Sequence, residues 1–135
     1  MTHVTTEPIV PERLLAAVSD SGRGGTALFI GTVRRSAADG PVDRIEYEAY
    51  PEMLEDEFGR ILAEARSRHG SVAVAGVHRI GTVRAGEASI AVAAAAPHRA
   101  EAFAICAWVV EEAKHRLPVW KREVFADGHR EWREG

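Results

Sequence analysis

Three stretches of the chain predict helices, two of them because apolar residues recur at helical spacing on one face. The clearest stretch runs from Pro51 to His69, with a proline in its first turn and Gly70 at its end. A shorter one covers Pro11–Ser19. The third covers about Pro97–Arg116, and its middle, AFAICAWVV, is apolar nearly all round, so we expect it to be buried on more than one side. The apolar face of the clearest helix consists of Leu54, Phe58, Ile61, Leu62 and Ala65.

Between these helices, apolar and polar residues alternate as in half-buried strands. We expect strands at TALFIGTVR, VDRIEYEAY, SVAVAGVHRI and SIAVAAAA, and a closing strand and turn at VWKREVFADG. GTVRAGE predicts a turn or a short strand. The order α, β, β, α, β, β, α, β predicts an α+β domain with a mainly antiparallel sheet. The length of 135 residues fits one domain, residues 1–135, with a single core.

Composition narrows the class of protein. Hydrophobic residues make up 46% and charged residues 27%, the balance of a soluble globular protein. No uncharged apolar run is long enough to span a bilayer, and the N-terminus lacks the features of a signal peptide, so we expect a cytoplasmic protein. The net charge of −3 argues against general nucleic-acid binding but leaves room for a local basic pocket. Cys106 has no partner for an intrachain disulfide, and its apolar surroundings predict a buried, inert thiol.

The cations are clustered, and one cluster begins the last predicted helix. His98 and Arg99 follow Pro97 there, where free N–H groups and the helix dipole favour anions. The small residues Ala93–Ala96 just before would let a ligand approach the backbone closely. This arrangement predicts an anion pocket, although solvated charges on a helix surface would give the same pattern.

A second pair of cations, Lys114 and Lys121, is separated by seven positions and a proline. If the closing strand folds back beside the helix end, the two ammonium groups meet and lower each other's pKa. A neutral lysine serves as a base or a nucleophile. The alternative is that Lys114 is merely a cation favoured by the helix dipole. The sequence has no metal-ligand spacing, P-loop or dinucleotide fingerprint, so we expect no metal and no cofactor, and we expect His78 to be structural.

Five segments, GGTALFIGTVR, YEAYPEM, VHRIGTVRAGE, AAPHRAEAF and LPVWKRE, occur in an order and spacing that resemble the large, catalytic subunit of molybdopterin synthase. The resemblance covers about Gly24 to Trp132. It implies an α/β hammerhead-type fold with additional strands, and a homodimer at the centre of a heterotetramer. It also implies a small ubiquitin-like sulfur-carrier subunit at each end, which inserts a C-terminal Gly-Gly tail carrying a thiocarboxylate.

The activity that this resemblance implies is that of a sulfur transferase in molybdenum cofactor biosynthesis. Two sulfur transfers would convert cyclic pyranopterin monophosphate (precursor Z) into the dithiolene of molybdopterin. Lys114 and Lys121 would be catalytic, and His98 and Arg99 would face the substrate phosphate. A cationic pocket suits an anionic substrate and an anionic thiocarboxylate. The substrate-binding residues implied are Thr32, Val33, Arg34, His98, Arg99, Lys114, Lys121, Arg122 and Glu123.

Two points depart from the family pattern or vary within it. Many relatives extend further at the C-terminus, where a basic residue reaches the pocket, and the sequence leaves open whether Arg130 or Arg133 takes that place. We expect the loop Arg35–Gly40 to be mobile until substrate binds.

Two other classes of function fit the same residues. A non-catalytic anion-binding module would use the pocket for regulation, and a thiocarboxylated partner would then change nothing chemically. A purely structural dimer would leave the cations solvated, and no phosphate would bind near His98. The pair Lys114 and Lys121 separates these alternatives, because an anion binder has little need of both beside a partner's tail.

Overall fold

The computed structural model describes residues 2–37 and 40–134. Four strands form its larger layer: β1 (Val4–Thr5), β2 (Gly25–Thr32), β5 (Ala73–Arg79) and β7 (Ala88–Ala96). Their order across the sheet is β1-β5-β7-β2, which leaves β2 at one edge. Neighbouring strands run antiparallel, except that β1 pairs with β5 in parallel.

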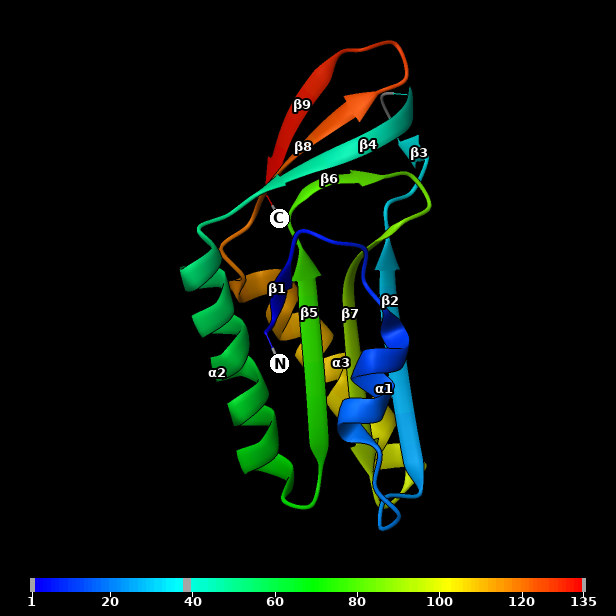
Figure 1. The fold of residues 1–135 in the computed structure, drawn as a ribbon, viewed down its shortest axis with the longest axis vertical. Helices are drawn as coiled ribbons and strands as arrows, with labels where there is room; N and C mark the ends of the chain where they lie inside the picture. Colours follow the sequence, from blue (N-terminus) through cyan, green and yellow to red (C-terminus); the bar gives the residue numbers. More distant parts are fainter. Residues whose placement is uncertain (1, 38–39, 135) are drawn as a thin grey trace.

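Three helices of the described residues cover the faces of this sheet: α1 (Pro11–Val18), α2 (Pro51–His69) and α3 (Arg99–Arg116). α1 lies across one face, and α2 and α3 lie against the other (Figure 1). Because successive residues of a strand point to opposite faces, the two faces draw on alternate residues. Even-numbered positions of β5 and β7 contribute to the cluster with α2 and α3, and odd-numbered positions to the cluster with α1.

A second sheet lies beyond one end of the first (Figure 1). Its strand β4 (Gly40–Glu48) pairs antiparallel with β3 (Ser36–Ala37), β6 (Gly81–Arg84) and β8 (Trp120–Phe125). β8 also pairs with β9 (Arg130–Glu134). β6 follows β5 closely and β8 follows α3 closely in the chain, so this sheet is held over the ends of both elements.

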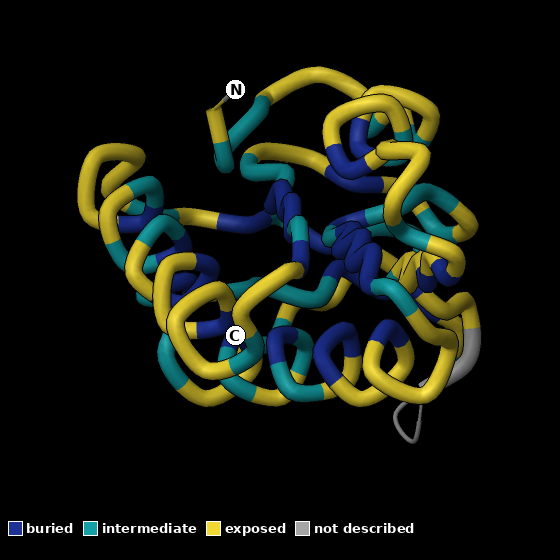
Figure 2. The backbone as a smooth tube through the Cα atoms, turned by 90° about the horizontal axis from the view of Figure 1, so that it is seen from below, coloured by how far each residue is buried: buried dark blue, intermediate teal, exposed yellow. Residues whose placement is uncertain are grey.

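The buried side chains form three groups rather than the single core that chain length predicted, because two groups lie on opposite faces of the larger sheet and the third packs against the second sheet. The largest group includes Phe58 of α2, which is fully buried against Gly76 of β5. β7 is buried along most of its length because helices cover both of its faces, and Ala91–Ala96 are all inaccessible to solvent. Figure 2 shows the buried residues gathered in the middle of the molecule and the exposed ones on the outer turns.

The predicted elements correspond closely to the observed ones. The α+β class, the mainly antiparallel pairing and the helix Pro51–His69 are confirmed. The last helix begins at Arg99 rather than Pro97, and the short strands β1, β3 and β9 were not predicted. β1 and β3 have two residues each, which is too short for an alternating pattern to indicate a strand. Residues 38 and 39, in the loop expected to be mobile, lie outside the described residues.

The expectation that the apolar middle of α3 is buried on more than one side is wrong for the isolated chain. The helix buries Ile105, Cys106 and Val109 against the sheet, which confirms a buried thiol at Cys106. Its opposite face is open, and the Phe103 side chain is 66% exposed. The reason is that α2 and the larger sheet cover only part of the helix surface.

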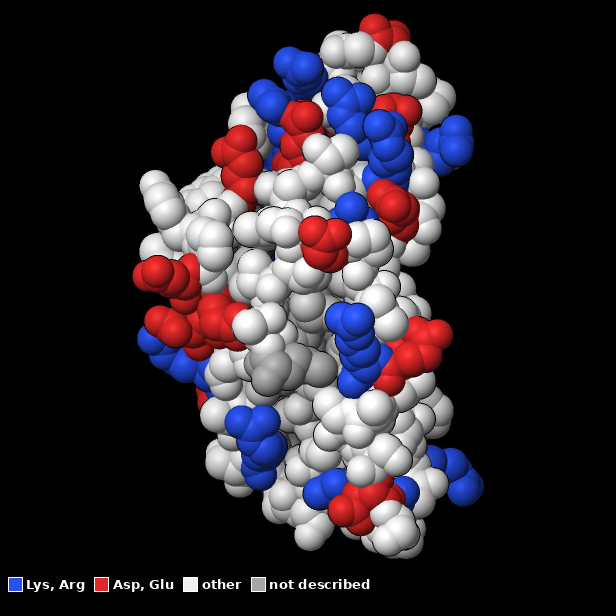
Figure 3. All heavy atoms as spheres, viewed as in Figure 1, with Lys and Arg blue, Asp and Glu red and all other residues white. Residues whose placement is uncertain are grey.

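Charged side chains of both signs are interleaved over the second sheet on the face seen in Figure 3. Several form ion pairs, such as Arg44 with Asp43 at 2.9 Å. Arg116 joins α3 to α2 by hydrogen bonds to Glu57 at 2.8 Å and Glu64 at 2.6 Å. Within the described residues, no helix combines the length and the apolar character needed to cross a membrane.

Candidate active site

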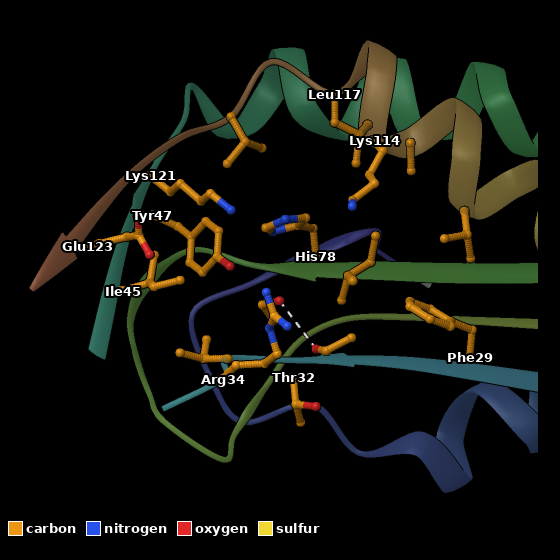
Figure 4. A pocket seen from close by; sticks show the side chains of 17 residues that line it. Phe29, Thr32, Arg34, Ile45, Tyr47, His78, Lys114, Leu117, Lys121 and Glu123 are labelled. Atoms are coloured by element: carbon orange, nitrogen blue, oxygen red, sulfur yellow. Dashed lines mark hydrogen bonds between the residues drawn. The ribbon is translucent and has the colours of Figure 1, made fainter. Parts of the chain in front are cut away.

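A pocket of about 330 Å³ lies where the larger sheet, the C-terminal end of α3 and the second sheet meet. Its walls are partly apolar, with Phe29, Ile45 and Leu117 among the lining residues. Its charged lining residues are Arg34, Lys114, Lys121 and Glu123. Figure 4 shows Lys121 and Glu123 entering from one strand, and Arg34 and Lys114 entering from other parts of the chain.

Lys114 and Lys121 enter the pocket because the chain reverses sharply between them. α3 ends at Arg116, and the Leu117 N–H still donates to the Ala113 carbonyl at 3.0 Å. Pro118 cannot continue the helix, and β8 begins at Trp120, so Lys121 returns beside the end of the helix. The two amino groups point into the same space from opposite sides (Figure 4). The sequence predicted that these two lysines meet only if the closing strand folds back beside the helix end, and in the structure it does.

Thr32, Val33 and Arg34 form the part of the wall contributed by the end of β2. Val33 is buried, and its N–H donates to the Glu87 carbonyl at 3.0 Å. A register irregularity lies between Gly31 and Thr32 at the end of the β2–β7 pairing. The strand end therefore holds Arg34 at the pocket, as expected from its position after the strand.

Neighbouring residues of β8 point to opposite faces of the strand, and only one of these faces lines the pocket. Glu123 lines the pocket beside Lys121, and the Arg133 Nε donates to its carboxylate at 2.8 Å. Arg122 points to the other face of the strand, where its Nε donates to Glu46 at 2.7 Å and its guanidinium lies over the Trp132 ring. The expectation that Arg122 lines the pocket is therefore wrong for this chain, because strand side chains alternate between faces.

The His98–Arg99 pair does not reach this pocket within the chain, contrary to expectation. It stands at the opposite end of α3 from Lys114, about 24 Å away at the usual helix rise per residue. Both residues are exposed. Gly25 of β2 makes the close approach to this helix start possible, since a Cβ there would lie 2.8 Å from the Arg99 Cα.

The floor of the pocket contains polar residues that sequence reasoning assigned to the core or overlooked: Tyr47, His78 and Ser89. The Ser89 hydroxyl donates to the Gly31 carbonyl at 3.3 Å, and burial raises the pKa of Tyr47. Burial also lowers the pKa of His78 to about 4; the hydrogen bond to a backbone carbonyl opposes this, and the charge of Lys121 adds to it. The alternation of the strand could have indicated this position. His78 lies four residues after Val74 and therefore on the same face of β5, the face that packs against α2 and α3.

This arrangement is suited to negatively charged ligands. Arg34, Lys114 and Lys121 supply positive charge beside apolar walls, where electrostatic interactions are stronger than in bulk water. Among the described residues, no three His, Cys, Asp or Glu side chains come together as a metal site. The Arg, Lys, His and Glu side chains that line the pocket can stabilise charge and transfer protons.

Comparison with known proteins places these observations in a family. A family model described as MoaE protein matches residues 4–116. The molybdopterin synthase catalytic subunit of Pyrococcus abyssi is 46% identical over 124 residues, which is 92% of this chain and 83% of that protein. The one from Emericella nidulans is 43% identical over 132 residues, 98% of this chain and 68% of that protein. The crystal structure of molybdopterin synthase from Staphylococcus aureus matches with a TM-score of 0.93 and 28% identity, covering 99% of this chain and 97% of that one.

Proposed function

The chain belongs to the MoaE protein family, and from that premise we propose that it is the catalytic subunit of a molybdopterin synthase. It transfers two sulfur atoms from the thiocarboxylated tail of a small ubiquitin-like subunit to cyclic pyranopterin monophosphate. The observation that carries the proposal is the pocket in which Arg34, Lys114 and Lys121 converge. Both reactants are anions, and this pocket offers each of them a cationic neighbour.

In the proposed reaction, the thiocarboxylate sulfur attacks a carbon of the pterin side chain as a carbon–oxygen bond at that carbon breaks, and the oxygen leaves with the electron pair of that bond. An acyl–sulfur intermediate forms, joining the small subunit to the pterin. Lys114 and Lys121 stabilise the charge that develops and move protons, because their amino groups face the same space. Water then cleaves the acyl–sulfur bond, and the sulfur stays on the pterin.

The phosphate group of the substrate needs binding residues besides those of the pocket, and we propose that a second copy of the chain supplies them. His98 and Arg99 lie too far from Lys114 to bind the same ligand within one chain, so we assign them to the pocket of a second copy. An exposed apolar strip supports such a homodimer, since Leu28, Phe29 and Ile30 lie on the free edge of the larger sheet. Unpaired edge strands are templates for association. Phe29 also lines the pocket, so a copy seated on this strip would lie beside the pocket.

The assembly and location follow from the same premise. The homodimer would form the centre of a heterotetramer, with one small subunit inserting its tail into each pocket. A cytoplasmic location fits the single, buried Cys106, because reducing compartments keep thiols free.

The decisive experiment is mass spectrometry of the purified chain mixed with cyclic pyranopterin monophosphate and a thiocarboxylated small subunit. Dithiolene product is expected from the native chain, and K114A should make none while melting within a few degrees of it. An Arg99→Ala variant should bind the substrate more weakly. A chain that binds phosphate but never yields product would instead be an anion-binding module, and normal turnover by K114A would remove that lysine from the mechanism.

A further inference from the structure

His78 is held rigidly in the floor of the pocket. It lies near the end of β5 and pairs with Ile90 of β7 on one side and Val4 of β1 on the other. Its backbone N–H donates to the His3 carbonyl at 2.9 Å. The ring meets Tyr47 edge to face, with 5.1 Å between ring centroids, and the residue is only 8% exposed. The imidazole therefore has one fixed orientation relative to the pocket.

One ring nitrogen of His78 takes part in a hydrogen bond within the chain, and the other is free to accept one. Nδ1 lies 2.7 Å from the Arg79 carbonyl oxygen, and a carbonyl oxygen only accepts, so Nδ1 carries the proton. Nε2 of the neutral ring is then an acceptor. The described residues give Nε2 no hydrogen bond, and the Arg79 Nε is their only unpartnered side-chain nitrogen or oxygen that is shut away from solvent. Nε2 thus keeps a free lone pair with access to the open space of the pocket.

The lone pair lies among the groups proposed to carry the reaction. Figure 4 shows the ring between the amino groups of Lys114 and Lys121. Burial lowers the pKa of His78 to about 4, and the charge of Lys121 adds to this effect, so the ring is neutral near pH 7. An anionic tail and an anionic substrate offset the cations, which raises the proton affinity of Nε2 when both are bound. The ionisable groups that line the pocket with it are Arg34, Tyr47, Lys114, Lys121 and Glu123.

We infer that His78 is the general base for the hydrolytic step, taking a proton from the water that cleaves the acyl–sulfur bond. This inference rests on the proposed function. The water oxygen bonds to the acyl carbon as one water proton passes to Nε2. The carbon–sulfur bond then breaks, its electron pair stays on the pterin sulfur as a thiolate, and the small subunit leaves with a carboxylate. The remaining proton and the one on His78 go to solvent, which restores the neutral ring. Lys114 and Lys121 lie where they can stabilise the thiolate and the tetrahedral oxyanion.

The test is single-turnover intact-mass analysis of H78Q in the complete complex with small subunit and pyranopterin. Glutamine keeps an acceptor in the pocket but cannot take up a proton. The covalent adduct of small subunit and pterin should form at nearly the native rate and accumulate, because its release should slow by about 100-fold or more. His115→Gln is the matched control: this histidine is exposed on α3, its Nδ1 lies 2.8 Å from the Glu111 carbonyl oxygen, and it does not line the pocket. It should release the adduct at the native rate.

The outcomes separate this inference from the proposed function. If the native chain forms neither adduct nor product, the proposed function fails. If the native chain turns over and H78Q releases the adduct equally fast, or changes only the substrate KM, then His78 is not the base. Should H78Q fail to fold, the native release rate against pH decides: a rate that falls in acid with the titration of one group supports the base, and a rate that stays flat from about pH 8 down to about pH 3 overturns it.

Discussion

The Arg133 Nε donates to the Glu123 carboxylate over 2.8 Å, which ties β9 to a residue that lines the pocket. Arg133 also donates to Glu131 within its own strand. Arg130 is an odd number of residues away and therefore faces the opposite side of the strand. Of the two C-terminal arginines, Arg133 is the one connected to the pocket.

Replacing Arg133 with glutamine should lower kcat/KM without unfolding the chain, because Glu123 would lose the contact that holds it beside Lys121. The pair is partly exposed and screened by solvent, so we expect a loss of about fivefold at most. Steady-state kinetics with the small subunit in excess would measure it. R130Q is the matched control and should keep native activity. An equal loss in both variants would mean that the strand, not the contact, matters.

Mixing K114A, which should be inactive, with R99A, which should bind substrate weakly, should restore native-like activity if His98 and Arg99 serve the pocket of a second copy. In a homodimer of K114A every site lacks the Lys114 amino group, and in a homodimer of R99A every site lacks the Arg99 guanidinium. In a mixed dimer, one site has both defects and the other has none, so random pairing restores about a quarter of the sites. The measurement is product formation after subunit exchange, with each variant alone as the control. If the pair acted on its own chain's pocket, every site in the mixture would keep one defect, and activity would not exceed the average of the two variants alone.

Gly76→Ala should destabilise the fold by about 1–3 kcal/mol, because an added Cβ would overlap the fully buried Phe58 ring. Urea denaturation followed by circular dichroism would measure the change. The double variant G76A/F58L should lose less than the two single losses added together, since leucine vacates the space of the ring.

Gly59→Ala is the control for that substitution. Gly59 lies inside α2, and an added Cβ would come no closer than 3.8 Å to the His3 ring. Alanine there should stabilise the chain by about 0.5–1 kcal/mol, as is usual inside helices. If both glycine variants destabilised the chain similarly, the contact with Phe58 would not be the cause.

The link between α2 and α3 through Arg116 should weaken in acid. Burial alone raises the pKa of Glu57, but the hydrogen bonds from Arg116 and Arg60 outweigh it and lower the pKa; hydrogen bonding to Arg116 also lowers the pKa of Glu64. Carboxylates whose pKa is lower in the folded state stabilise the fold above their unfolded pKa of about 4.3. They lose this contribution as pH falls through the folded pKa.

The native chain should therefore exceed R116Q in unfolding free energy by a constant amount near neutral pH, and the difference should shrink below about pH 4. Urea titrations at a series of pH values would follow it. R60Q is a milder control, because Arg60 contacts Glu57 but not Glu64. A difference that does not change with pH would exclude the carboxylates as its source.

The sequence by itself determined the local structure and the chemical character of the site. A period-3.6 pattern located α2, and period-2 patterns located the long strands, because both periods follow from the backbone geometry of each segment. A long apolar run ended by Pro118 located α3. The proline between Lys114 and Lys121 made a reversal there predictable. The resemblance to a family then supplied roles that spacing alone could not.

Only the tertiary structure decided which of these residues share a pocket. The length of α3 keeps His98 away from Lys114, and the alternation of β8 turns Arg122 away from the pocket while Glu123 lines it. His78 becomes a pocket residue because the end of β5 meets residues of α3 and of the second sheet there. Periodicity fixes which way a side chain points from its own element. What it meets there depends on contacts between segments far apart in the chain, which the local pattern does not encode.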